Sequence, residues 1–121
     1  MPDYGRYGSF NGVSICTGPG HVRLAISFAS SRAQGKMTLT ALPPVGACDH
    51  GEIDELRLRE SVLEGIRSAS NESGTLLQPA EVHYVANDTP RYDMFCRAAY
   101  LIARGVEEGI EFPDRPEWSG T

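Results

Sequence analysis

No apolar stretch in this 121-residue sequence approaches the length of about 18 residues that a helix needs to span a membrane. The start of the chain, Met1–Tyr7, is polar and lacks the apolar core of a signal peptide. The hydrophobic fraction of 40% and the charged fraction of 22% are ordinary for a soluble globular protein. We therefore expect a cytoplasmic protein.

Cysteine and positive charge are both scarce. The three cysteines, Cys16, Cys48 and Cys96, are an odd number with wide spacing, which favours reduced thiols over a disulfide framework. The net charge of −5 argues against broad, non-specific binding of nucleic acid, because such binding relies on many Lys and Arg side chains that neutralise phosphates. A local basic contact with RNA is compatible with this charge.

The motifs of common catalytic sites are also missing. No stretch fits the phosphate-binding pattern G-x-x-x-x-G-K-[ST], and the sequence has no nucleophile elbow and no suitable pair of carboxylates. Cys48, Asp49 and His50 place a thiol and an imidazole in one loop, which suits either a nucleophile with its base or two metal ligands. A zinc site needs about four ligands and no second pair exists, so we favour a polar loop that leads into a helix. We predict no catalytic activity, no metal and no cofactor.

Two stretches have the period of amphipathic helices. In the first, from about residue 54 to 70, Gly65 predicts close approach to a neighbouring backbone, with a tolerated surface glycine as the alternative. The second is expected over residues 91–108, with Thr89 as its cap and Pro90 at its first position. The two apolar stripes consist of Leu58, Val62, Leu63, Ile66 and Ala69, and of Met94, Phe95, Ala98, Leu101, Ile102 and Val106.

Four segments alternate between apolar and milder residues, as strands do. They are Gly12–Cys16, His21–Ala29, Lys36–Leu42 and Ala80–Ala86. The polar connector Ser30–Gly35 has the length of a hairpin loop, so we expect the second and third strands to pair as a hairpin.

The order β-β-β-α-β-α predicts an α/β (α+β) two-layer sandwich, a four-stranded sheet with two helices on one face. We expect a single domain over residues 1–121, with an irregular arm at 1–10, the core at 11–110 and a tail at 111–121 that contacts the domain through Phe112 or Trp118. The other face of the sheet is polar enough to meet water and equally suited to docking. Its residues are Arg23, Ser27, Lys36, Thr38, Thr40, Glu81 and His83.

A set of apolar, Gly and Pro positions between residues 60 and 103 follows the pattern of a known family. These positions are Val62, Gly65, Ile66, Ala69, Gly74, Leu76, Pro79, Val82 and Tyr84, followed by Phe95, Ala98 and Ala99. The stretch resembles domain IV of the ribosomal translocase elongation factor G. The resemblance implies the ribosomal protein S5 domain 2-like fold, whose order of strands and helices agrees with the order derived above.

In that family, loops at the tip of domain IV reach into the decoding centre of the small ribosomal subunit, and one of these loops joins the last strand to the last helix. The resemblance therefore implies a small, stand-alone, non-enzymatic protein that binds the ribosome or structured RNA and requires no nucleotide or membrane. The implied contact residues are Asn87, Asp88, Thr89 and Arg91 in this loop, with Arg23 and Lys36.

The corresponding loop here, Asn87–Pro90, is shorter than the loop usual in the family and lacks its histidine. The short loop and the acidic net charge favour an alternative, a protein–protein interaction module that keeps the fold without a role in translation. The two hypotheses differ in the partner that they predict.

Overall fold

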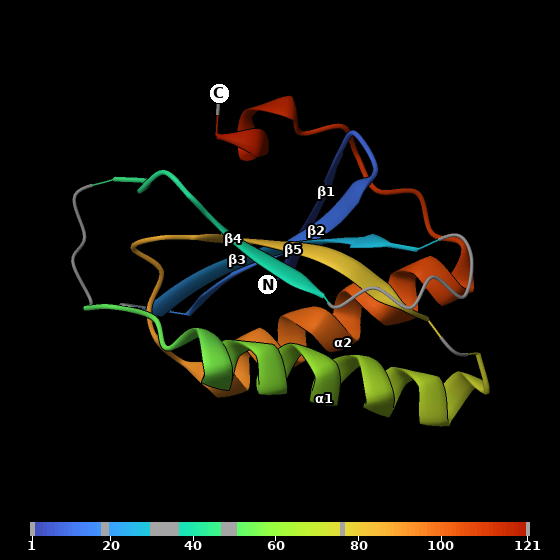
Figure 1. The fold of residues 1–121 in the computed structure, drawn as a ribbon. Coiled ribbons are helices and arrows are strands. Elements are labelled where there is room, and N and C mark those ends of the chain that lie inside the picture. The colour runs from blue at the N-terminus through green and yellow to red at the C-terminus, as the bar shows by residue number, and fades with distance from the viewer. Residues whose placement is uncertain (1, 18–19, 30–36, 47–50, 76, 121) are drawn as a thin grey trace.

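The computed structural model describes residues 2–17, 20–29, 37–46, 51–75 and 77–120 of the chain. Its elements, in chain order, are β1 (Pro2–Tyr7), β2 (Phe10–Thr17), β3 (Gly20–Phe28), β4 (Thr38–Leu42), α1 (Glu55–Ser73), β5 (Pro79–Val85), α2 (Tyr92–Glu108) and the 3₁₀-helix η1 (Pro116–Ser119). Figure 1 shows the sheet between α1 and α2 on one side and η1 on the other. Within the described ranges, no helix combines the length and the apolarity that a membrane span requires.

The strands form one sheet in the order β1-β2-β3-β5-β4. Neighbouring strands are antiparallel, except that β4 and β5 are parallel, because α1 connects them as a crossover. The predicted mixed α/β class is confirmed. The sheet has five strands, however, where the sequence predicts four.

The additional strand is β1, which stands where an irregular arm is expected over residues 1–10. It pairs with β2 from Pro2↔Ile15 to Tyr7↔Phe10. The strand has no apolar period that the sequence could show. At Gly5 this has a physical reason, because any side chain there would clash with Trp118: a Cβ would lie 2.6 Å from its ring. The residue at this position is thus restricted by packing against a segment that is distant in the sequence.

The prediction that β3 and β4 pair as a hairpin is wrong. β5 lies between these strands, antiparallel to β3 and parallel to β4. Alternation along a strand determines which face is buried, but it does not determine which strand becomes the neighbour. The neighbour here arrives from beyond α1.

The first predicted helix is confirmed, with α1 extending slightly further than expected. Its cap is Asp54, whose carboxylate accepts hydrogen bonds from the backbone N–H groups of Leu56 and Arg57 at 3.0 and 3.4 Å. The helix ends at Gly74, which adopts a φ of +76° that favours glycine.

Gly65 marks the place where α1 and α2 meet most closely, as the sequence predicts. A Cβ at this position would overlap the carbonyl oxygen of Cys96 and would lie 2.9 Å from the backbone nitrogen of Tyr100. The alternative of a tolerated surface glycine is therefore wrong, because the residue is buried against the partner backbone.

The start of α2 differs from the expected one. The helix begins at Tyr92 with Arg91 in the capping position, so neither Thr89 as cap nor Pro90 as first helical residue is correct. The hydroxyl of Thr89 instead accepts a hydrogen bond from the backbone N–H of His21 at 2.9 Å. The loop before α2 is thus tied to β3, which postpones the start of the helix.

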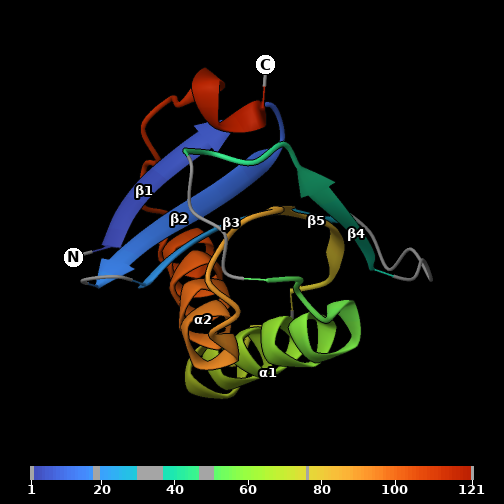
Figure 2. The same ribbon diagram turned by 90° about the vertical axis from the view of Figure 1, so that its left-hand side faces the viewer.

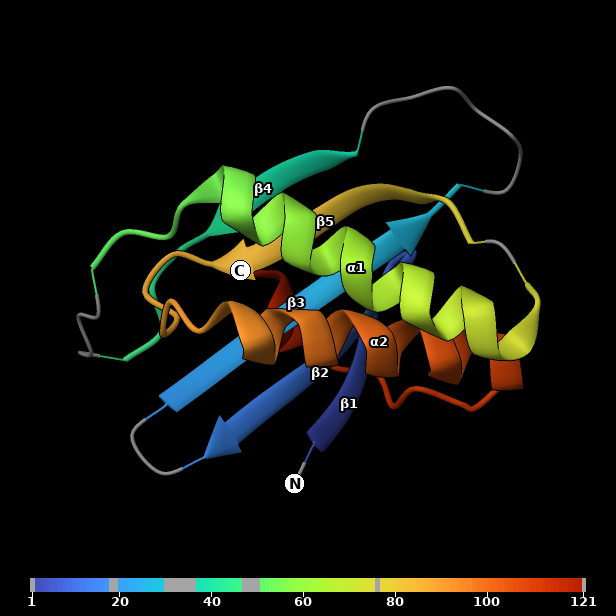
Figure 3. The same ribbon diagram turned by 90° about the horizontal axis from the view of Figure 1, so that it is seen from below.

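The main core lies between the sheet and the two helices, which cross the strands side by side (Figure 3). α2 contacts β2 and β3 and packs along α1. The side chains that are at most 1% exposed in this core are Val13, Val22, Leu24, Ile26, Leu58, Val62, Ala69, Val82, Phe95, Ala98, Ala99, Ile102 and Ala103. Both predicted apolar stripes thus supply core residues, as expected.

The C-terminal segment passes from the end of α2 along the β1 edge at Arg6 and places η1 on the opposite face of the sheet. Figure 2 shows η1 above β1 and β2, on the side away from α1 and α2. Trp118 in η1 is 7% exposed. Phe112 is 5% exposed and lies on the helix-covered side, next to Gly105 of α2, where it packs edge-on against Tyr4 with ring centroids 5.4 Å apart. The expected contacts of the tail therefore exist at both aromatic residues.

Candidate functional site

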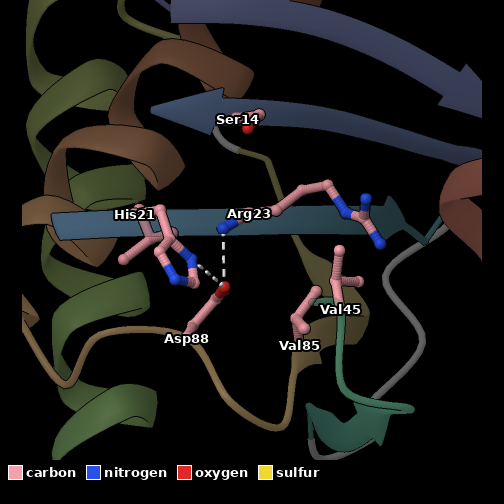
Figure 4. A pocket seen from close by; sticks show the side chains of 7 residues that line it. Ser14, His21, Arg23, Val45, Val85 and Asp88 are labelled. Carbon is pink, nitrogen blue, oxygen red and sulfur yellow. Dashed lines mark hydrogen bonds and ion pairs between the residues drawn. The ribbon is translucent and has the colours of Figure 1, made fainter. Parts of the chain in front are cut away.

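A small pocket opens where β3 begins and β5 ends, beside the loop that leads into α2. Its volume is about 90 Å³. We refer to it as the tip pocket, and Figure 4 shows the side chains around it. The lining residues are Ser14, His21, Val22, Arg23, Val45, Val85 and Asp88.

Asp88 is the central polar residue of the tip pocket. Its side chain is 3% exposed, and one carboxylate oxygen accepts a hydrogen bond from the backbone N–H of Arg23 at 2.8 Å. The other oxygen lies 3.3 Å from Nδ1 of His21. A buried carboxylate requires such partners, because an unpaired one is strongly disfavoured away from water. Asp88 therefore fastens the loop to the start of β3.

The environment changes the acidity of Asp88. Burial raises the pKa of its carboxyl to about 6, and the hydrogen bond from the Arg23 backbone and the proximity of His21 only partly oppose this rise. Burial likewise lowers the pKa of the Arg23 guanidinium from its ordinary value. The tip pocket thus contains a carboxyl group that changes its charge close to neutral pH.

Asn87 and Thr89 hold the same loop on either side of Asp88. The side-chain amide of Asn87 accepts from the backbone N–H of Val45 at 2.9 Å and donates to the Val45 carbonyl at 2.8 Å. The backbone N–H of Thr89 donates to the carbonyl of His21 at 3.0 Å, in addition to the bond at its hydroxyl. The loop is thereby attached both to β3 and to the segment that follows β4.

The guanidinium of Arg23 points away from Asp88, as Figure 4 shows. One of its nitrogens lies 3.4 Å from the carbonyl oxygen of Trp118, and its central carbon lies 5.3 Å from the centre of the indole ring. η1 therefore covers this cation in part.

Arg91 lies outside the pocket and forms a fork with Asp93. Two guanidinium nitrogens of Arg91 donate to the two carboxylate oxygens of Asp93 at 3.0 and 2.7 Å. The side chains are 53% and 67% exposed, so the pair is a surface contact that contributes little to stability. Lys36, the remaining predicted contact residue, lies outside the described residues.

The structure thus brings Arg23 and Asp88 together in one pocket, flanked by Asn87 and Thr89, and leaves Arg91 apart. Sequence reasoning missed His21 and Ser14 as members of the pocket. The glycine and proline at positions 18–20 indicated only a turn next to His21. No sequence signal connected that turn to a loop about 65 residues later.

A second polar cluster lies on the sheet face opposite the helices, where the sequence predicts Glu81 and His83 but gives no sign of Tyr7 and Phe10. The hydroxyl of Tyr7 lies 3.0 Å from Nδ1 of His83, and Nε2 of His83 lies 2.9 Å from a carboxylate oxygen of Glu81. Phe10 stacks on the His83 ring with centroids 4.0 Å apart. Burial raises the pKa of Tyr7 to about 12, so the phenol keeps its proton.

The proposed metal or thiol site in the loop before α1 is not part of the described structure. In the described part of the chain, no group of three or more His, Cys, Asp or Glu side chains could hold a metal ion. The candidate residues Cys48, Asp49 and His50 lie outside the described ranges.

Comparison of the chain with family models, with curated proteins and with solved structures gave no match.

Proposed function

We propose that this chain is a non-enzymatic, cytoplasmic binding domain related to domain IV of elongation factor G, and that its tip engages the ribosome or structured RNA. The order of elements supports the proposal, because β2, β3, β4, α1, β5 and α2 follow one another as the strands and helices of that domain do. β1 and η1 are additions at the two ends of this arrangement.

The observation that carries the proposal is the anchoring of the loop between β5 and α2. Asn87, Asp88 and Thr89 each bond to another segment of the chain, and these bonds fix the loop before any partner arrives. A loop held in one conformation loses little conformational entropy when it binds. The side chains that the resemblance assigns to contact thus act here as supports, which leaves the loop backbone and Arg91 to meet a partner.

The proposal can be tested by following backbone amide signals in NMR spectra while small ribosomal subunits or a decoding-site RNA are added at low salt. We expect changes confined to residues 87–91 and the adjoining ends of β3 and β5. Arg91→Glu should weaken binding by about tenfold, because it places a negative charge where phosphates approach. Arg67→Glu is the matched control, since it makes the same charge change at an exposed position of α1. No change with either ligand would refute the proposal.

A second candidate function is a protein–protein interaction module. The pairing of the tip cations favours it, because Arg91 is bound to Asp93 and Arg23 to the C-terminal segment. Cations that are already paired offer less attraction to a phosphate backbone. A pull-down would then recover a specific protein with the wild type and with Arg67→Glu, and lose it with Arg91→Glu. Recovery that is equal for all three proteins would contradict a tip-mediated contact.

A further inference from the structure

The C-terminal segment is attached to the sheet in two different ways. At the β1 edge, the backbone N–H of Arg6 donates to the Pro113 carbonyl at 2.8 Å, and the Arg6 carbonyl accepts from the N–H of Arg115 at 2.7 Å. Beyond Arg115, no backbone–backbone hydrogen bond joins η1 to a strand within the described residues. Contacts of side chains therefore hold η1 on the face where Figure 2 shows it. We expect η1 to open at Arg115 while the segment before it stays in place.

Trp118 fills a recess on this face of the sheet. Its indole is 7% exposed and lies on Gly5, where a Cβ would stand 2.6 Å from the ring. The central carbons of the Arg23 and Arg115 guanidinium groups lie over the indole, 5.3 and 5.6 Å from its centre. We refer to the space bounded by Gly5, Arg23 and Arg115 as the indole recess. It accommodates a flat, two-ring aromatic system next to two positive charges.

One hydrogen-bond donor in the indole recess lacks an acceptor. Nε of Arg115 is buried and has no hydrogen-bond partner in the described part of the chain, although Nη2 of the same guanidinium donates to Asp3 at 3.0 Å. A buried donor without an acceptor is unfavourable. The indole of Trp118 cannot provide the acceptor, because its polar atom is an N–H donor. Trp118 thus matches the shape of the indole recess and leaves its hydrogen-bonding capacity unused.

An unpaired purine base has the properties that the indole lacks. Its two fused rings are flat, as those of an indole are, and their edges carry acceptor atoms. Bases of single-stranded RNA also stack on guanidinium planes, and the phosphates beside them attract the charges of Arg23 and Arg115. A tryptophan from a protein partner would only repeat the contacts that Trp118 already makes. The chemistry of the indole recess therefore favours a purine.

We propose that η1 is a lid over the indole recess, and that an unpaired purine of RNA displaces Trp118 from it. The indole recess adjoins the tip pocket, because Arg23 borders both. The inference rests on the proposed function for its partner, RNA, and assigns to that partner a base-binding site. In the free protein the lid occupies this site, so the apparent affinity for RNA is lowered to the extent that η1 stays closed.

The fluorescence of Trp118 tests the displacement directly, because it is the only tryptophan of the chain. A short single-stranded oligoadenylate should shift the emission to longer wavelength until the site is saturated, since the displaced indole meets water. Oligouridylate, whose bases have one ring, should require a concentration at least about fivefold higher. Emission that stays unchanged with oligoadenylate would overturn the proposal, and equal responses to both would overturn the assignment of a purine.

A free nucleotide is a second source of the same chemistry. Adenosine monophosphate should produce the shift only at a concentration at least about tenfold higher than oligoadenylate, because it brings fewer phosphates to the two guanidinium groups. A response to the mononucleotide at the same concentration would overturn the assignment to RNA.

Two variants separate a lid from a structural contact, with fluorescence anisotropy of a labelled oligoadenylate as the measurement. Trp118→Ala should bind at least about fivefold more tightly than the wild type, because the competing group is gone. Arg115→Gln should bind at least about fivefold more weakly. Arg67→Gln, the same change at an exposed position of α1, is the control. Circular dichroism should show that the variants keep the wild-type fold. Weaker binding by folded Trp118→Ala would overturn the proposal, since the indole would then support the ligand.

The outcome for the indole recess can be distinguished from the outcome for the tip. Amide changes at residues 87–91 without a shift in Trp118 emission would refute the lid and leave the proposed function standing. A shift in Trp118 emission, together with RNA binding that Arg91→Glu leaves unchanged, would support the lid and refute contact through the tip.

Discussion

The two faces of the sheet are stabilised in different ways, although the same strands form both. The helix-covered face is a continuous apolar layer in which side chains such as Leu24, Ile26 and Phe95 are fully buried. The opposite face is covered by a few specific contacts, among them Trp118 over Gly5 and the hydrogen-bonded chain of Tyr7, His83 and Glu81. Apolar burial provides most of the stability on the first face, and polar geometry determines the arrangement on the second.

This difference implies that the two faces respond differently to substitution and to pH. Truncations on the helix-covered face should cost the most free energy and should show little dependence on pH. Changes on the opposite face should cost less free energy. They should also change how stability depends on pH, because ionisable groups with shifted pKa values, such as Tyr7, Arg23 and Asp88, lie on this face or at its end.

The largest effect is expected for Phe95→Ala in α2. The side chain is 0% exposed, and its removal leaves a cavity in the main core, so the free energy of unfolding should fall by about 3–5 kcal/mol. Urea denaturation followed by circular dichroism measures this change. Leu56→Ala, at a side chain that is 73% exposed, is the control and should change little. Similar losses for the two variants would contradict the assigned core.

Trp118→Ala should have a smaller effect, a loss of about 2 kcal/mol. The indole is 7% exposed, but it packs against Gly5 of β1, Arg23 and Arg115 and not in the main core. We expect the segment that carries it to detach locally while the rest of the protein stays folded. Hydrogen exchange should show faster exchange at the Arg6 and Arg115 amides than in α2. Glu117→Ala, on the exposed side of η1, is the matched control. Uniformly faster exchange over the whole chain would argue against this local role.

Asp88→Asn should remove a pH dependence that the wild type shows. Burial raises the pKa of Asp88 in the folded protein to about 6, while an unfolded aspartate has a pKa of about 4. The folded state therefore binds a proton that the unfolded state has lost. The resulting stability is fully present below about pH 4 and is lost as the pH rises through about 6, a change of about 2 kcal/mol between about pH 4 and 7.

The measurement is the difference in unfolding free energy between wild type and Asp88→Asn from pH 4 to 7. His21 and Arg23, the ionisable residues that face Asp88, are present in both proteins. Asn retains an oxygen that accepts the N–H of Arg23. Asp93→Asn is the control at a carboxylate that is 67% exposed. Parallel curves for wild type and Asp88→Asn would show that Asp88 does not titrate as expected.

The smallest effect is expected for Tyr7→Phe on the opposite face. The substitution removes one hydrogen bond to His83 and keeps the ring, so the loss should be about 1 kcal/mol. A double-mutant cycle with His83→Gln isolates the coupling between the two residues. Additive effects of the two substitutions would mean that the contact contributes nothing to stability.

Much of the helix-covered face could be predicted from the sequence. The apolar stripes of α1 and α2 and the alternation in β3 and β5 identified most of its buried residues, because periodicity reports which side of an element avoids water. Gly65 indicated the close contact between the helices for a similarly local reason, since a glycine within a helix is otherwise unfavourable.

The candidate site could be predicted only in part. Asn87, Asp88 and Thr89 were named as residues that contact a partner, but their side chains bond to Val45, Arg23 and His21 within the chain. The same residue types serve either purpose, and only the neighbouring segments decide between them. His21 and Ser14 gave no signal, because a pocket assembled from three separate segments has no motif.

The sequence by itself thus determined which residues face the core, where the two helices lie and that the class is mixed α/β. Only the tertiary structure decided that β5 separates β3 from β4, that Pro2–Tyr7 forms a fifth strand, and that the C-terminal segment bridges to the β1 edge at Arg6. The physical reason is that burial periodicity is a local property of each segment. Strand order and edge pairing depend on backbone hydrogen bonds between distant segments, and almost any residue can form them.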